Sequence, residues 1–350
     1  MEIFTLKPKL YFGADALGAL RELGGKRVLV VTDGFLASSG LLDKVRVNLP
    51  GCAVTVFDKV TPDPSVELVA QGVRVLQECA PEAILAFGGG SPMDCAKAIR
   101  YLSGQDIPLW AIPTTAGTGS EMTAYAVLTD TEKGIKHPLV ADSLLPEFAV
   151  LDAALLAGVP PTVTADTGMD VLTHAAEAYV SPRATPFTDA LAEKAFVLAY
   201  QNLSDAYRTA GESEAKEAML YASCMAGMAF NAAGLGICHS LAHALGGRLH
   251  LPHGRLNAIL LPRVVAFNAT QGRAAEKYGK LAKLCGLAGN PRALSAALSR
   301  MLTTLKLPRT LNVDDPATVA AAALDDPCTR TNPRTPTAAE LESILRELSR

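Results

Sequence analysis

The feature that most constrains the fold is a change near residue 152 in residue composition and in the spacing of apolar residues. Before it, short apolar runs alternate with stretches whose apolar residues recur at helical spacing. Four of these runs are expected to form buried strands: residues 27–33, 53–58, 83–89 and 109–115. Strands that alternate with helices in this way form a parallel sheet with helices on both faces.

After residue 152, alanine, leucine and methionine dominate and β-branched runs become rare. Helices are expected at residues 164–180, 187–209, 213–232, 237–246 and 255–268, with more beyond residue 273. The sequence therefore predicts two domains: an α/β domain over residues 1–152 with a parallel sheet, followed by an all-helical domain over residues 153–350.

Composition excludes several classes of protein. The chain has 350 residues, of which 49% are hydrophobic, so it can bury two sizeable cores. Its net charge of -3, without a basic block, argues against nucleic acid or an anionic membrane as a partner. No apolar run approaches the roughly 18 residues of a membrane span, and the first residues lack a signal-peptide pattern. The seven cysteines form no CxxC pair, so we expect buried thiols in a cytoplasmic protein.

Histidines cluster in the second half of the chain. Four of the six fall within GLGICHSLAHALGGRLHLPHG: His239, His243, His250 and His253. His174 follows Asp170 by four residues, a spacing that places both side chains on one face of a helix. Carboxylate and imidazole ligands together suit zinc or a divalent transition metal.

The sequence therefore predicts that Asp170, His174, His239 and His253 form a metal site. Glu177, one turn beyond His174, is a candidate for orienting a ligating imidazole, although a solvated helix face is an equal alternative. His250 alternates with leucines in an expected loop, so we interpret it as a bystander.

A glycine turn links one predicted strand to the following helix in AILAFGGGSPMDCAKAI. Gly89 and Gly90 allow close backbone approach, and Ser91 can cap the helix. A helix N-terminus of this kind binds phosphate. The pattern is neither GxGxxG nor a Walker P-loop, so a purely structural turn is the alternative.

A second polar turn, PTTAGTGSEMT, follows the next strand and carries several hydroxyls, including those of Thr114, Thr115 and Thr123. Two such turns after neighbouring strands suit the pyrophosphate of a dinucleotide. Asp33 ends the first clear strand, where a carboxylate would bind ribose hydroxyls and repel a 2′-phosphate, which favours NAD over NADP. The alternative is that Asp33 is a turn residue before Gly34.

In combination, these segments resemble the iron-dependent (group III) alcohol dehydrogenases. The matching pieces are VTDGFL, TPDPS, GGGSPMDCAKAI, PTTAGTGSE, KGIKHP, TGMDVLTHAAEAY and CHSLAHALGGRLHLPHG, in the family's order. Within the family, TPDP, GIKHPL, SPRATPFTDALAEKA and LHLPHG are most similar to the 1-propanol dehydrogenases associated with bacterial microcompartments.

The resemblance implies a dehydroquinate-synthase-like fold, with an α/β NAD-binding domain and an all-helical metal- and substrate-binding domain. It implies Fe²⁺, or Zn²⁺ in its place, bound by Asp170, His174, His239 and His253, with His243 near the nicotinamide as a proton relay. It also implies a set of residues that line the NAD site: Asp33, Gly89, Gly90, Ser91, Asp94, Thr114, Thr115, Thr123, Tyr125, Lys136, Leu155 and Gly158.

The activity implied is NAD(H)-dependent interconversion of short-chain aldehydes and primary alcohols, with propanal and 1-propanol first and ethanol or butanol as further substrates. A homodimer or higher homo-oligomer is expected, with a microcompartment shell or aldehyde-producing enzymes as partners and a microcompartment as its location. Two alternatives stay open: a glycerol- or 1,2-diol-type dehydrogenase, and an inactive partner-binding subunit.

Two departures from the family pattern stand out. Asp63 replaces an asparagine that is common in relatives, and the chain is shorter after residue 285. The first falls at a position expected to contact the adenosine. The second should alter the edge of the helical domain rather than the metal site.

Overall fold

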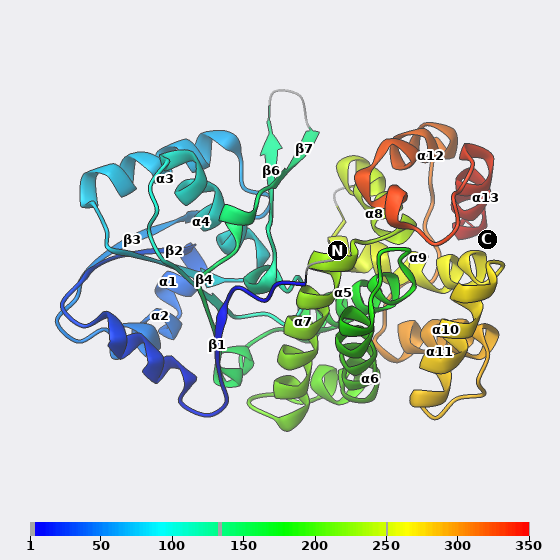
Figure 1. Cartoon of the computed structure of the whole chain (residues 1–350), viewed down its shortest axis with the longest axis horizontal. Coiled ribbons are helices and arrows are strands. Elements are labelled where there is room, and N and C mark those ends of the chain that lie inside the picture. The colour runs from blue at the N-terminus through cyan, green and yellow to red at the C-terminus, as the bar shows by residue number, and fades with distance from the viewer. Residues whose placement is uncertain (1–3, 132–134, 250, 350) are drawn as a thin grey trace. The chain divides into compact units, whose positions relative to one another are not determined.

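The chain folds into two compact units, seen in a computed structural model that describes residues 4–131, 135–249 and 251–349 (Figure 1). Unit 1 comprises Met1–Val159 with Ala210–Ser213, and unit 2 comprises Pro160–Thr209 with Glu214–Arg350. The division predicted after residue 152 falls just past the last strand of unit 1. The residues between that strand and Pro160 therefore pack with unit 1.

Unit 1 is built on a parallel sheet with the strand order β1-β8-β5-β4-β2-β3. Its strands are β1 (Lys9–Phe12), β2 (Arg27–Asp33), β3 (Ala53–Val60), β4 (Ala83–Gly88), β5 (Leu109–Pro113) and β8 (Phe148–Leu151). The central strands β4 and β5 are buried along their whole length, as expected for a sheet covered on both faces. The predicted parallel sheet is thus confirmed.

The helices and short turns of unit 1 connect these strands. They are η1 (Ala16–Leu23), α1 (Gly34–Ser38), α2 (Leu41–Arg46), α3 (Val66–Cys79), α4 (Gly90–Ser103), η2 (Ser120–Met122), η3 (Asp142–Leu144) and η4 (Ala153–Leu156). Two further strands, β6 (Tyr125–Asp130) and β7 (Ile135–Val140), form an antiparallel hairpin outside the main sheet. Helix α3 approaches α4 closely at Gly72, where a Cβ would lie 2.2 Å from Cδ1 of Ile99.

The strand order creates a switch point between β2 and β4. The chain leaves β2 toward β3 on one side, whereas it leaves β4 toward β5 on the other. In open parallel sheets, a crevice forms at the carboxyl ends of two strands whose connections diverge in this way. The carboxyl ends of β2, β4 and β5 therefore lie along one edge, which we call the cofactor edge. We define it by Asp33, Gly88–Ser91 and Thr114–Thr118.

In its described residues, unit 2 contains helices joined by connecting segments, and no strand. Its helices are α5 (Pro161–Val180), α6 (Pro186–Arg208), α7 (Glu214–Ala233), α8 (Ile237–Leu249), α9 (His253–Asn268), α10 (Gly272–Leu284), α11 (Pro291–Thr304), α12 (Pro316–Asp325), η5 (Pro327–Thr331) and α13 (Ala338–Leu348). Helix α5 is buried on all sides from Thr164 onward, apart from one partly exposed position, and packs against α6, α7 and α9. A helix that is buried all round is the core element of its domain.

Among the described residues, no single helix has the length and hydropathy to cross a membrane. Helices α7 and α8 satisfy those two criteria only as a pair, bent by 102° at the break between them.

Candidate functional site

Helix α5 presents a row of three polar side chains to the interior of unit 2. Asp170, His174 and Glu177 follow one another at helical spacing, and each is at least 95% buried. Buried carboxylates and imidazoles are costly unless they bind something, so this face of α5 marks a site rather than an ordinary helix surface.

Helices α8 and α9 bring two more histidines to the same point. The Nε2 atoms of His239 and His253 each lie 3.8 Å from Oδ1 of Asp170. The ring of His174 stacks on that of His239, with centroids 4.6 Å apart. The four residues predicted as metal ligands therefore lie close together, and we call them the metal centre.

The donor atoms of the metal centre fit a divalent transition metal. One atom from each of Asp170, His174 and His239 lies within 4.8 Å of the others. Two donors 3.8 Å apart can both reach one ion, because metal–nitrogen and metal–oxygen bonds are about 2.0–2.2 Å. Burial and neighbouring imidazoles hold the pKa of His239 well below its usual value, so the ring is neutral and keeps a lone pair. Nδ1 of His174 is buried without a hydrogen-bond partner among the described residues.

Asn257 sits at the middle of the metal centre and was not predicted from the sequence. Its Nδ2 lies 2.7 Å from Oδ1 of Asp170, 3.2 Å from Nε2 of His239 and 3.1 Å from Nε2 of His253. Two amide hydrogens cannot serve three acceptors well, so these atoms form an electron-rich group suited to a cation. The sequence feature that could have identified Asn257 is its position four residues after His253 on α9.

Glu177 contacts the metal centre through Nδ1 of His239, the ring nitrogen on the side away from Asp170. Its carboxylate accepts hydrogen bonds from the amides of Gly236 at 2.9 Å and Cys238 at 2.7 Å, and lies 2.6 Å from Nδ1 of His239. Burial raises the pKa of Glu177 to about 7. Holding Nδ1 turns Nε2 of His239 toward Asp170. Glu177 is buried, so the solvated helix face considered as its alternative is wrong, and its role in orienting a metal ligand stays a prediction.

His243 lies beside the metal centre. Its ring stacks on that of His253 with centroids 5.2 Å apart, and its Nδ1 lies 2.8 Å from Oδ2 of Asp326. Asp326 is distant in sequence and was not predicted. His250, interpreted as a bystander, lies outside the described residues.

The cofactor edge of unit 1 collects the two predicted turns and Asp33. Gly89 is the N-cap of α4, so the first amides of that helix are free to bind a ligand such as a phosphate. Gly88 has φ +151°, and a Cβ there would lie 2.5 Å from Cγ of Pro92. Asp33 is the N-cap of α1, and its Oδ1 accepts from the amide of Leu36 at 2.9 Å. Asp33 can therefore cap α1 and also bind ribose hydroxyls, because only Oδ1 is used for the cap.

The glycine turn and the threonine turn pack directly against each other. A Cβ on Gly89 would lie 3.1 Å from Oγ1 of Thr115, and one on Gly90 would lie 2.8 Å from Cγ2 of Thr118. The amide of Thr114 donates to the carbonyl of Gly88 at 3.0 Å. A side chain at either glycine would therefore press against the threonine side chains of the other turn.

Several other predicted cofactor residues are engaged within unit 1. Asp94 accepts from the hydroxyl of Ser120 at 2.9 Å and from the amide of Val127 at 3.0 Å. The buried ammonium of Lys97 donates to Oγ1 of Thr123 at 3.1 Å and to the carbonyl of Tyr125 at 2.9 Å. These contacts fix the threonine turn to α4, and contact of Asp94, Thr123 and Tyr125 with a cofactor stays a prediction.

For the remaining predicted cofactor residues, the structure gives a position in the fold but no contact that bears on cofactor binding. Leu155 is buried in η4, which follows β8, whereas Gly158 is exposed with open space around it. Lys136 belongs to β7, but its side chain lies outside the description of the structure. Asp63 has φ +56°, a conformation that aspartate and asparagine both tolerate.

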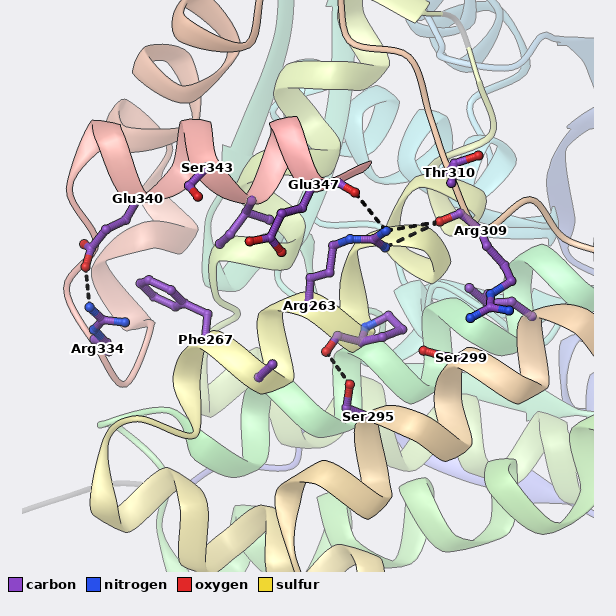
Figure 2. A pocket seen from close by; sticks show the side chains of 14 residues that line it. Arg263, Phe267, Ser295, Ser299, Arg309, Thr310, Arg334, Glu340, Ser343 and Glu347 are labelled. Carbon is purple, nitrogen blue, oxygen red and sulfur yellow. Dashed lines mark hydrogen bonds and ion pairs between the residues drawn. The ribbon is translucent and has the colours of Figure 1, made fainter. Parts of the chain in front are cut away.

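A separate cavity of about 800 Å³ lies within unit 2 between α9, α11 and α13 (Figure 2). Arg263 and Arg309 line it together with serine hydroxyls, and the guanidinium of Arg263 donates to the backbone carbonyls of Ile259, Arg309 and Glu347. None of the predicted metal or cofactor residues lines this cavity.

Comparison with known proteins places both halves of the chain in one family. Residues 7–153 match the model of iron-containing alcohol dehydrogenase, and residues 164–349 match that of the Fe-containing alcohol dehydrogenase family, C-terminal. The chain is 44% identical to 1-propanol dehydrogenase PduQ of Salmonella typhimurium, over 99% of this chain and 100% of that protein. It is 39% identical to the NADPH-dependent butanol dehydrogenase of Clostridium saccharobutylicum, over 98% and 96%.

Solved structures agree with this assignment. The sulfoacetaldehyde reductase of Bifidobacterium kashiwanohense in complex with NAD⁺ matches with a TM-score of 0.92 at 27% identity, over 100% of this chain and 99% of that one. The chain therefore belongs to the iron-containing alcohol dehydrogenase family. The resemblance noted in the sequence is confirmed, and so are its fold class and its assignment as an oxidoreductase that uses iron and a nicotinamide dinucleotide.

Proposed function

We propose that the protein is an NAD(H)-dependent, metal-dependent alcohol dehydrogenase that interconverts short-chain aldehydes and primary alcohols, with propanal and 1-propanol as the preferred pair. The observation that carries the proposal is the convergence of the buried Asp170, His174 and His239 with the half-buried His253. The 44% identity to a 1-propanol dehydrogenase supports the choice of substrate.

The metal centre would hold Fe²⁺, or Zn²⁺ in its place, and the ion supplies a Lewis acid that polarises the carbonyl or alcohol oxygen. Glu177 keeps His239 in the tautomer that offers Nε2 to the ion. The burial of Asp170, His174 and His239 excludes water, which strengthens electrostatic interactions at the reacting oxygen. His243 holds or releases the proton that this oxygen exchanges, and its exposed position gives it access to solvent.

The cofactor edge would bind NAD(H). The free amides at the start of α4 and the threonine turn offer donors to the pyrophosphate, and Asp33 offers Oδ2 to the ribose hydroxyls. Among the relatives, one is named NADPH-dependent and one was solved with NAD⁺. The carboxylate of Asp33 favours NAD because it would repel a 2′-phosphate.

The surroundings of His174 favour a small apolar substrate over a polyol. Phe230 of α7 stacks on the His174 ring with centroids 4.5 Å apart. Phe230 adds an apolar side chain and no hydrogen-bonding group beside the metal centre, where the extra hydroxyls of glycerol or a 1,2-diol would need partners. This contact favours the primary-alcohol reading over the diol alternative.

The proposal is tested by following NADH oxidation with anaerobic, iron-loaded protein. We expect the highest kcat/KM with propanal in a panel of acetaldehyde, propanal, butanal, lactaldehyde and dihydroxyacetone. A preference for the hydroxylated compounds would instead establish the diol-type alternative. Absence of turnover with every compound would favour the inactive, partner-binding alternative.

We also infer a location and an assembly. The likeness to microcompartment-associated relatives in the sequence supports a homodimer or higher homo-oligomer in the cytoplasm, enclosed with aldehyde-producing enzymes. Light scattering of the purified protein would measure the assembly. Co-sedimentation of a tagged chain with purified shells would support the location, and its recovery only in the unenclosed fraction would contradict it.

A further inference from the structure

The contact between Asp326 and His243 joins two distant parts of unit 2. Asp326 lies where α12 ends and η5 begins, 83 residues after His243 on α8. Its Oδ2 lies 2.8 Å from Nδ1 of His243, and its Oδ1 accepts from the amide of Cys328 at 2.8 Å. The two carboxylate oxygens therefore have separate tasks, one toward the backbone and one toward the imidazole.

The carboxylate of Asp326 is held in place by a further hydroxyl. Ser240, one turn before His243 on α8, lies 3.5 Å from Oδ1 of Asp326. Its hydroxyl lies 2.8 Å from that of Thr329, which donates to the carbonyl of Ala323 at 2.6 Å. Helix α8 and the α12–η5 connection are thus linked by several polar contacts, which leave Asp326 little freedom to move.

The surroundings of Asp326 also favour its ionised form. Burial alone would raise its pKa, but the hydrogen bonds from His243 and from the Cys328 amide lower the pKa to about 2. Burial raises the pKa of the adjacent Cys328 thiol well above its usual value, so that group stays neutral. Within the described part of the chain, Asp326 is the carboxylate that forms an ion pair with His243.

We propose, on the basis of the function proposed above, that Asp326 is a positioning residue that fixes the tautomer and ring orientation of His243. An ionised carboxylate can only accept, so Nδ1 must carry the proton that it shares with Asp326. Nε2 is then the atom that exchanges a proton with the substrate. In alcohol oxidation the hydroxyl proton moves to Nε2 while hydride leaves carbon for NAD⁺, and in aldehyde reduction the same proton returns to oxygen.

A purely structural role is the competing explanation, because Asp326 is also the N-cap of η5. The substitution Asp326→Asn separates the two roles. Asparagine caps as well as aspartate does, but it lacks the charge and can present its NH₂ group to the ring. Asp315→Asn is the matched control: Asp315 caps the other end of α12, accepting from the amide of Thr318 at 3.2 Å, and among the described residues it contacts no histidine.

Two measurements test the proposal. The first is the ¹⁵N spectrum of histidine-labelled, zinc-loaded protein, with His243→Gln to assign the signal. We expect His243 to carry its proton on Nδ1 in the wild type, and to lose that preference in Asp326→Asn but not in Asp315→Asn. A proton on Nε2 of His243 in the wild type would overturn the proposal.

The second measurement is steady-state propanal reduction by the iron-loaded enzyme. We expect Asp326→Asn to lower kcat on the order of 100-fold, with metal content and the KM for NADH unchanged. A kcat within about threefold of the wild type, or a loss shared by Asp315→Asn, would overturn the proposal. If the wild type reduces no aldehyde, the proposed function fails, whereas the ¹⁵N tautomer still decides whether Asp326 positions His243.

Discussion

The metal centre of unit 2 and the cofactor edge of unit 1 are built in different ways. The metal centre is made of side chains from α5, α8 and α9, which lie close together because three helices pack around them. The cofactor edge is made largely of backbone, exposed where parallel strands end and glycines allow two turns to touch. Side-chain sites are therefore sensitive to single polar substitutions, whereas backbone sites are sensitive to an added Cβ or a changed charge.

This difference also explains how the contacts are distributed. In the metal centre, Nε2 of His239, Nε2 of His253 and Oδ1 of Asp170 face one another, and Glu177 supports them from outside. At the cofactor edge, predicted residues such as Asp94 and Thr123 are already bound to other residues of unit 1. The polar atoms of the first region face one another, whereas those of the second are held by contacts between its own turns.

The largest effect is expected from Asp170→Asn. Removing the one carboxylate among the four predicted ligands should eliminate bound iron and lower propanal reduction by at least about 10³-fold. Metal analysis and NADH oxidation measure both. Asp166→Asn, one turn earlier on α5, is the control: it breaks the ion pair with Arg255 but should retain the metal. Full iron content in Asp170→Asn would refute the ligand assignment.

The second largest effect is a loss of metal affinity in Glu177→Gln. Three N–H groups point at the Glu177 carboxylate, and glutamine offers them a single oxygen. We expect metal affinity to fall about 10–100-fold, measured by competition with a chelator. Glu193→Gln on α6 is the control, because Glu193 binds Tyr179 and Lys280 instead. Equal losses in both variants would show a general effect on unit 2.

A moderate effect is expected at the cofactor edge from Asp33→Ser. Serine keeps the cap on α1 but removes the charge that would repel a 2′-phosphate. The ratio of kcat/KM for NADPH to that for NADH should rise about tenfold or more, with Asp43→Ser unchanged. A wild type that already uses both cofactors equally would show that Asp33 does not select between them.

The smallest effect is a pH-dependent one within unit 1. Burial raises the pKa of Glu121 to about 7. Between its unfolded value near 4.5 and that pH, the folded state binds the extra proton, so this group destabilises the fold progressively as pH rises. Glu121→Gln should therefore gain stability relative to the wild type from about pH 5 to about pH 8, measured by urea unfolding.

Glu147→Gln is the control for this prediction. Although burial alone would raise the pKa of Glu147, hydrogen bonds from the Leu109 amide and Lys7, together with the charge of Arg100, lower it. Its titration therefore falls below the window used for Glu121. A flat difference between Glu121→Gln and the wild type across that window would contradict the expectation.

The sequence predicted which residues converge in the metal centre because their signal is local. The four-residue spacing of Asp170 and His174 on α5 survives in the fold, since both project from one helix face. The parallel sheet could also be predicted from the sequence, because its strands are short apolar runs that alternate with helical stretches. Asn257 shares the same four-residue spacing from His253, but an asparagine at that spacing is not by itself a sign of a site.

Other features could not be read from the sequence, because they depend on packing between distant segments. Asp326 meets His243 only after α12 and η5 fold against α8. Lys97 lies inside the glycine motif, yet its bonds to Ser120 and Thr123 require the threonine turn to fold back on α4. The local pattern indicates that such residues are polar or charged, but not which partners they meet.

The central claim is that the metal centre binds one ion on which aldehyde reduction depends. The most direct test is an anaerobic titration of metal-free protein with Fe²⁺, in which bound iron and the initial rate of NADH oxidation with propanal are measured in the same samples. We expect both to rise together and to saturate at one ion per chain. Full activity in the metal-free protein, or iron that binds without restoring any activity, would contradict the account.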